Sequence, residues 1–371
     1  MTHAATPVAA SARDMRLDAL RGLFLVIMAG VHVPTPLSRW LHEPMGYLSA
    51  AEGFVFLGAC LAGFVFSKVR RKSGAALMRT RIFARVKRIY AVHLGLVLAA
   101  VTVAWALAGR VRPLQYHFHD FLQHPIESLA LIPLLLHQPP LFDILPLYIV
   151  FLGLTPWCLG LAARRGWAVV LGGSAILWAA AQWMPPGGLV KALAPWIALR
   201  LGSFNLLGWQ FLWVLGLAAG ETMVREPHGV RRHRRAPLWP ALAIVAAGIL
   251  CRHRFGLQPV MVPNFAFWTD KWRLGPLRLI DSMAWAVLLW SWNPRPPLWL
   301  VKPLALLGRN SLAVFAAHIP LAIVATTWIA LQERSAAART VVGFAVVGAL
   351  FPFAWLLERR AGAAHRLDRA A

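Results

Sequence analysis

Two ionisable side chains lie inside the first long apolar segment of the chain, which opens near Ala19. Arg21 and His32 are 11 residues apart. That spacing is about three helical turns plus roughly 20°, so both face the same side of a helix, about 16 Å apart along its axis. Asp18 precedes Arg21 by three residues and can pair with it on that face. Burying such groups in a membrane costs several kcal/mol without a partner or a function, so this face is a candidate site. The alternative is a histidine that only packs and forms a hydrogen bond.

Glu52 lies in the first turn of the second apolar segment, which we expect to begin on the side where the first one ends. His32 and Glu52 would then lie at the same depth. A carboxylate beside an imidazole fixes the tautomer of the ring and stabilises the imidazolium formed when the ring takes a proton. The pair is therefore a candidate general base with its orienting partner. Alternatively, Glu52 is an acid favoured by the dipole at the N-terminus of a helix.

Further polar residues fall at the same predicted end of other apolar segments. Taken together they predict a polar pocket that faces outward. They are Asp143 in the fourth segment, Asn205 and Gln210 in the sixth, and Arg278 and Asp281 in the eighth. Taken singly, Asp143 has the position of a helix cap, and Arg278 with Asp281 has that of a structural ion pair.

Arginine collects at the opposite end of the predicted segments. Arg85 and Arg88 open the third segment, and Arg309 with Ser311 opens the ninth. Arginine binds phosphate groups in a bidentate manner, and helix starts offer free backbone N–H groups to anions. These residues are candidates for binding a phosphorylated ligand. The alternative is the ordinary excess of positive charge on the cytoplasmic side of a membrane protein. His318, deeper in the ninth segment, fits either a packed core or the pocket.

Membrane helices are the elements that must position these residues. The chain of 371 residues is 59% hydrophobic with a mean hydropathy of +0.60, which is too apolar for one soluble core of this size. A stretch at 126–136 is short and is expected to be interfacial or re-entrant. We predict an all-α, polytopic membrane helix bundle forming a single domain over 1–371, with 1–16 and 358–371 as tails. Spans of roughly 17–25 residues are predicted at about ten places: 19–37, 49–67, 89–108, 143–162, 167–184, 203–220, 237–251, 277–292, 306–330 and 339–357.

Basic residues predict the orientation of this bundle. Nine of them lie between Lys68 and Arg88, which marks that loop as cytoplasmic and places both termini on the same side. The runs 164–165 and 231–235 and the C-terminal tail agree. Four cations between the seventh and eighth segments run against the trend, namely Arg252, Arg254, Lys271 and Arg273.

The basic residues that give the chain its net charge of +24 lie between the apolar segments. We therefore expect contact with membrane lipids and no nucleic acid. Cys60, Cys158 and Cys251 show no metal-ligand spacing, so the sequence predicts neither a metal site nor a disulfide framework. The first apolar run is followed by no small-residue cleavage site, which indicates a retained helix rather than a signal peptide.

Five stretches, in order along the chain, resemble the OpgC family of membrane glucan modifiers, which is related in pattern to the acyltransferase-3 proteins. They are RLDALRG at 16–22 with His32, AAEGFVFL at 50–57, DILPLY at 143–148, WQF at 209–211, and GRNSLAVF at 308–315 with His318. The spacing of Arg21 and His32 and the pattern Arg85-x-x-Arg88 are similar to acyltransferase-3 motifs. The resemblance runs from about Arg13 to about Leu357. The sequence departs from the family at Ser49, at Gly58 to Cys60 and at Asn310.

The resemblance implies an acyl-CoA-dependent O-acyltransferase of the bacterial inner membrane. It would move an acyl group, succinyl as in the family or acetyl, from cytoplasmic acyl-CoA to a hydroxyl of a periplasmic glucan or another glycan. Carried onto this chain, His32 is the catalytic base and Glu52 its partner. Pocket residues are Asp18, Asp143, Tyr148, Asn205, Gln210, Arg278, Asp281 and His318, and acyl-CoA is expected to contact Arg21, Arg85, Arg88, Arg309 and Ser311.

Two other functions fit the same residues. A transporter or flippase for an anionic or lipid-linked substrate could use arginine, histidine and glutamate in the membrane as a proton relay, although no repeated pair of broken helices is evident. A structural partner of a polymer-synthesis machine would need none of them for chemistry. The sequence is compatible with a homo-oligomer, and with either direct transfer or an acyl-His32 intermediate.

Overall fold

The computed structural model describes residues 15–107, 109–184, 188, 199–225, 238–253, 264–292, 296–332 and 334–370. These residues form helices and connecting segments, with isolated β-bridges and no strand among them. The predicted all-α class is therefore confirmed. The basic run 231–235, Arg254 and most of the predicted N-terminal tail lie outside the described residues.

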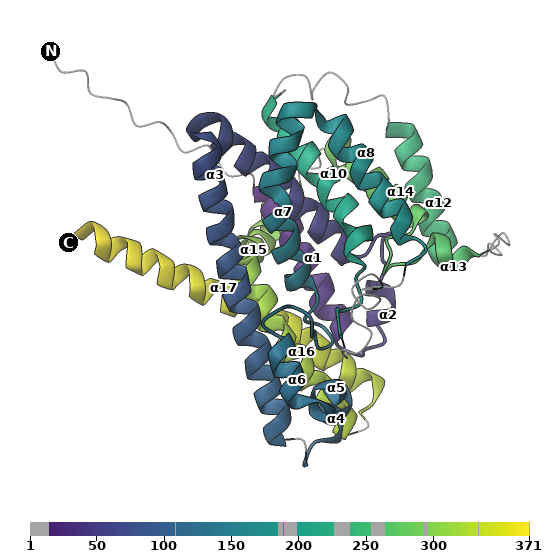
Figure 1. Ribbon diagram of the computed structural model, residues 1–371. Helices are drawn as coiled ribbons and strands as arrows, with labels where there is room; N and C mark the ends of the chain where they lie inside the picture. The colour runs from purple at the N-terminus through teal and green to yellow at the C-terminus, as the bar shows by residue number, and fades with distance from the viewer. Residues whose placement is uncertain are drawn as a thin grey trace.

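The helix that carries Arg21 and His32, α1 (Met15–His32), lies in the middle of the bundle (Figure 1). It packs along α15 (Leu298–Arg309). A Cβ atom at Gly308 would lie 1.8 Å from the carbonyl oxygen of Asp18, and one at Gly22 would lie 1.9 Å from that of Leu304. Only glycine allows these backbones to approach so closely, which is a packing mode typical of membrane helices.

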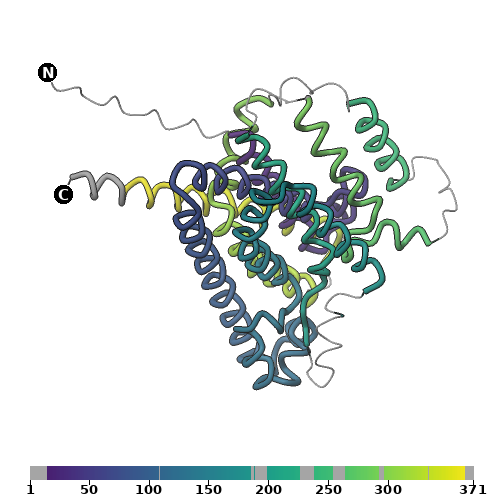
Figure 2. Tube along the Cα trace, turned by 45° about the horizontal axis from the view of Figure 1, so that its top comes forward, coloured from purple at the N-terminus to yellow at the C-terminus, as the bar shows by residue number. Residues whose placement is uncertain are grey.

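The longest helix, α3 (Ala50–Leu107), contains two of the predicted spans and changes direction between them. Gly74 has a φ of +85°, a backbone conformation that is open to glycine and costly for other residues. The first part of α3 packs on α10 (Leu206–Arg225), and the second part runs as a long arm along the molecule (Figures 1 and 2). As a result, α3 carries Glu52 and the Arg85–Arg88 pair on two separate segments.

The other helices surround this centre. The long ones are α7 (Ile144–Arg165), α8 (Trp167–Ala181), α12 (Leu238–His253), α14 (Pro276–Trp292), α16 (Ser311–Leu331) and α17 (Ala336–Ala370). The short ones are α2 (Ser38–Leu41), α4 (Arg112–His117), α5 (His119–Gln123), α6 (Pro125–Leu131) and α13 (Phe265–Trp268). α4, α5 and α6 gather at one end of the molecule (Figure 1). α16 contacts both α17 and α1, which brings His318 toward His32.

Within the described part of the chain, four helices are long and apolar enough to cross a membrane: α3, α7, α16 and α17 up to Ala363. α8 and α12 are shorter apolar helices. These helices support a membrane protein, while the count of about ten spans and the sides of the two termini stay predictions. The stretch 126–136 forms only the short helix α6 followed by turns.

The start predicted for the ninth span is wrong. The sequence predicts that span over 306–330, but residue 306 belongs to α15, and the helix breaks at Asn310 before α16 starts. Arg309 therefore ends α15 instead of opening a span. Its guanidinium pairs with Glu358 of α17, with 2.6 Å between Nε and Oε1. The tail predicted after 358 continues α17 as a helix.

Candidate active site

Two histidines from distant parts of the sequence meet at the end of α1. Nδ1 of His32 lies 3.1 Å from Nε2 of His318, and the planes of the two rings differ by 21°. His318 is buried, with 1% of its surface exposed, whereas His32 is half-buried. The contact joins the last residue of α1 to the second turn of α16, so the partner of His32 comes from the other end of the chain.

A neighbouring hydrogen bond determines which ring nitrogens carry protons. Nδ1 of His318 lies 2.6 Å from the carbonyl oxygen of Phe315. Because a carbonyl can only accept, this Nδ1 holds the proton, and Nε2 of the neutral ring is an acceptor. His32 then donates to it from Nδ1, which leaves Nε2 of His32 unprotonated. This assignment from hydrogen-bond partners gives His32 the lone pair that a general base needs.

Glu52, the predicted partner of His32, is engaged elsewhere. Its side chain is completely buried, and Oε1 accepts from Nε of Arg278 at 3.0 Å. Oε2 accepts from the backbone N–H of Ser49 at 3.0 Å and from the Ser49 hydroxyl. The predicted His32–Glu52 pair is therefore replaced by His32–His318, and Glu52 fixes the start of α3. Ser49, which stands where the family pattern led us to expect an acid, donates to this carboxylate.

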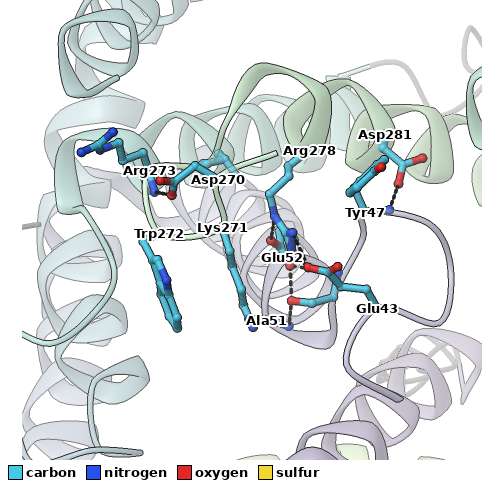
Figure 3. A network of polar contacts seen from close by, with 12 residues as sticks. Glu43, Tyr47, Ala51, Glu52, Asp270, Lys271, Trp272, Arg273, Arg278 and Asp281 are labelled. Carbon is cyan, nitrogen blue, oxygen red and sulfur yellow. Dashed lines mark hydrogen bonds and ion pairs between the residues drawn. The ribbon is translucent and has the colours of Figure 1, made fainter. Parts of the chain in front are cut away.

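Arg278 is the centre of a buried ionic network (Figure 3). Both terminal nitrogens of its guanidinium lie 2.5 Å from Oε1 of Glu43, while Nε binds Glu52. Glu43 also binds Arg252 through its other oxygen. Asp281 instead accepts the backbone N–H of Tyr47 at 2.8 Å, so the alternative account, an ion pair between Arg278 and Asp281, is wrong. With 1% of its surface exposed, Arg278 is held between two carboxylates.

Two other predicted pocket residues, Asp143 and Asn205, hold a connecting segment and a helix start in place. Asp143 makes no side-chain cap to α7; its carboxylate accepts from the N–H of Ser203 at 3.1 Å. Asn205 accepts from the first N–H groups of α10, Leu207 and Gly208, at 3.0 and 3.1 Å.

Gln210 joins α10 to α8. It accepts from the Ser174 hydroxyl at 2.6 Å and donates to the Ser174 carbonyl at 2.8 Å. The site prediction grouped Gln210 with Asp143 and Asn205 in one polar pocket. The structure instead gives each of them a separate structural partner. A mostly apolar cavity of about 250 Å³ lies beside Asn205 and is lined chiefly by α7, α10 and the turn at 134–138.

The residues expected to bind the donor lie on α1, on the second part of α3, at the end of α15 and at the start of α16. A guanidinium nitrogen of Arg21 donates to the hydroxyl of Ser311. The predicted pocket residue Tyr148 donates to the carbonyl oxygen of Phe54 at 2.7 Å and lies within range of the charges of Arg21 and Arg85.

The Arg85-x-x-Arg88 motif lies at the surface. Arg85 and Arg88 are both exposed on the second part of α3. Asp18 is buried beside α15, and its pairing with Arg21 stays a prediction.

Two charged residues of the site were missed from the sequence. Glu43 lies in the connection between α2 and α3, and Lys271 lies in the turn before α14. The charge of Lys271 acts on His32 and also on Glu52. The available signal was that Arg252 and Lys271 ran against the predicted charge bias of the loops. Among the described residues, no group of three or more histidine, cysteine or acidic side chains is suited to a metal.

Helices long and apolar enough to cross a membrane, around a histidine pair and a buried ionic network, indicate a helical membrane protein with a polar centre. The chain belongs to the OpgC family: the family model described as OpgC protein matches residues 13–362. No curated protein and no solved structure matches the chain. Family membership indicates a membrane transferase that modifies glucan.

Proposed function

We propose that the protein transfers an acyl group, with succinyl the first to test, from cytoplasmic acyl-CoA to a hydroxyl of a periplasmic glucan in the inner membrane. The observation that carries the proposal is the orientation of the two histidines. The hydrogen bonds from His32 to His318 and from His318 to Phe315 leave Nε2 of a half-buried imidazole free of a proton. Activation of a hydroxyl group requires such a base.

The chemistry follows from this lone pair. Nε2 of His32 takes the proton of the acceptor hydroxyl while its oxygen attacks the thioester carbonyl. The C–O bond forms, and the π pair of the carbonyl moves onto its oxygen. When the C=O bond re-forms, the C–S bond breaks, and the leaving CoA thiolate takes the proton from the His32 imidazolium. His318 accepts from Nδ1 of His32 throughout, which orients the ring and stabilises its charged form. Because a thioester is already activated, an acyl-enzyme intermediate is unnecessary.

The donor side of the proposal rests on the arginines. Arg85 and Arg88 are exposed on α3, and guanidinium groups bind phosphates well. We place the CoA nucleotide there, at the cytoplasmic face. The pantetheine would then pass between the helices, by way of Arg21 and Tyr148, toward His32. Arg309 is the weaker candidate, because Glu358 already pairs with it.

The test uses the purified full-length protein in lipid nanodiscs, mixed with succinyl-CoA labelled in the succinyl group and a linear β-glucan. We expect release of free CoA in an amount equal to the label that appears on the glucan. A transporter or a flippase would release no free CoA. Absence of both products, with acetyl-CoA as well as succinyl-CoA, would refute the proposed enzyme.

A further inference from the structure

A tightly held turn, residues 269–275, connects α13 to α14. The carbonyl groups of four consecutive residues in it accept hydrogen bonds from α8, α10 and their ends. Nε1 of Trp209 donates to the carbonyls of Lys271 and Trp272, at 3.1 and 3.2 Å. The Arg273 carbonyl accepts from Gln182 at 3.1 Å, and the Leu274 carbonyl accepts from Trp178 at 2.9 Å.

Two further hydrogen bonds hold the backbone of the turn, one from outside it and one within it. The N–H of Asn205, just before α10, donates to the Trp272 carbonyl at 2.8 Å. The carboxylate of Asp270 accepts the N–H of Arg273 at 2.9 Å. A turn fixed at this many points holds its side chains in a defined position, as a preorganised site requires.

The side chain of Lys271 is the one that this turn directs into the site. It points the same way as Arg278, toward the start of α3 near Ala51 and Glu52, whereas Arg273 points away (Figure 3). Its ammonium lies 5.5 Å from the centre of the Trp272 ring. Among the described residues no carboxylate forms an ion pair with Lys271, because Glu43 and Glu52 are bound to Arg278.

Burial and the neighbouring charges act on this ammonium in opposite directions. Burial lowers the pKa of Lys271 and Arg278 lowers it further, while Glu52, Glu43 and Asp143 raise it. The same charge acts on His32 and His42. Lys271 is therefore a partly desolvated cation near the candidate base, whereas the buried Arg278 and the hydrogen-bonded Gln210 are engaged elsewhere.

We propose that Lys271 is a catalytic residue that donates a hydrogen bond to the thioester carbonyl oxygen as that oxygen becomes negatively charged. This inference rests on the proposed acyl transfer. As the acceptor oxygen attacks, the carbonyl π pair moves onto oxygen, and an N–H of the ammonium stabilises the oxyanion. When the C=O bond re-forms and the thiolate leaves, Lys271 keeps all its protons. Hydrogen-bond donors fixed near the oxygen that becomes charged stabilise the transition state strongly in sites that exclude water.

The test compares Lys271→Met with Arg273→Met in full-length protein in nanodiscs, with succinyl-CoA and linear β-glucan. Arg273 is a matched control, because it lies in the same turn and points away from the site. Loss of one oxyanion donor lowers kcat by roughly 10²–10³-fold, so we expect that loss in Lys271→Met with little change in the KM for the donor. Arg273→Met should keep kcat within about twofold. Equal kcat for Lys271→Met and the wild type would overturn the role of Lys271 and leave the acyl transfer itself standing.

Lys271→Arg supplies a second measurement that a folding defect cannot mimic. Only the protonated form of lysine carries the positive charge that stabilises an oxyanion, and burial lowers the pKa of Lys271, so wild-type kcat should fall on the alkaline side below the ordinary lysine value. Arginine stays charged throughout. Lys271→Arg should therefore retain part of the activity and lose this alkaline limb. The same alkaline limb in both proteins would contradict the proposal. An inactive wild type would instead refute the proposed function.

Discussion

Nδ1 of His32 and Nε2 of His318 lie 3.1 Å apart, although 286 positions separate the two residues in the sequence. The carbonyl of Phe315 fixes the proton on the far nitrogen of His318. As a result, Nδ1 of His32 donates to His318, and Nδ1 of His318 donates to Phe315. Nε2 of His32 is then left unprotonated, with its lone pair available. This relationship makes His318 a positioning residue for the candidate base.

Replacing His318 tests that role. His318→Phe removes the acceptor, so the His32 ring loses its fixed tautomer. We expect kcat to fall by about 10²-fold, within the 10²–10⁴-fold that a positioned base contributes, with little change in the KM for acyl-CoA. His318→Gln places an amide oxygen near the lost Nε2 and should restore most of kcat. Steady-state kinetics of both variants provide the check, and equal losses in the two would contradict an acceptor role.

Glu52 should matter for stability more than for chemistry. Glu52→Gln breaks a fully buried ion pair with Arg278, and such losses cost on the order of 3–5 kcal/mol. Glu358→Gln is the control, because its partly exposed pair with Arg309 is worth about 0–1 kcal/mol. Thermal unfolding in detergent should show a clearly lower Tm only for Glu52→Gln. If the folded Glu52→Gln protein matched the kcat loss of His318→Phe, Glu52 would be the orienting partner after all.

The contact between α1 and α15 depends on glycine. Gly308→Ala places a Cβ atom 1.8 Å from the Asp18 carbonyl oxygen, and two backbones cannot move apart without cost. Overpacking of this kind costs about 1–3 kcal/mol, so the Tm should fall. Gly348→Ala serves as the control, because nothing lies within 4 Å of its added Cβ atom. Its Tm should stay level or rise, since alanine favours a helix. A Gly308→Ala protein with an unchanged Tm would contradict the described packing.

We expect two exposed arginines of α3 to differ in their effect on acyl-CoA binding. Arg85 lies within range of Tyr148, so Arg85→Ala should raise the KM for acyl-CoA several-fold and leave kcat nearly unchanged. Arg79, which is also exposed on the same helix, provides the matched control, and its alanine variant should keep the wild-type KM. A titration of initial rate against acyl-CoA measures both. Identical shifts in the two variants would indicate general surface charge instead of a donor site.

Local sequence patterns predicted the helices well, because apolar length and helical spacing are properties of neighbouring residues. The same patterns placed Arg21 and His32 on α1 and Glu52 in the first turn of α3. They could not give partners, since His318, Glu43 and Arg278 reach their contacts only through packing of distant helices. The apolar residues on both sides of Asn310 also hid the break there, although Gly308 lies two residues before it. The sequence marked Lys271 only as a positive charge in a loop where the predicted orientation expects few.

The central claim is that the His32 imidazole activates the acceptor. The most direct measurement is the mass spectrum of linear β-glucan after incubation with succinyl-CoA and either wild-type, His32→Ala or His124→Ala protein, each shown to be monodisperse in nanodiscs. His124 is an exposed histidine. The account predicts succinylated glucan from the wild type and from His124→Ala, and none above background from His32→Ala. Succinylated glucan from His32→Ala in wild-type amounts would contradict it.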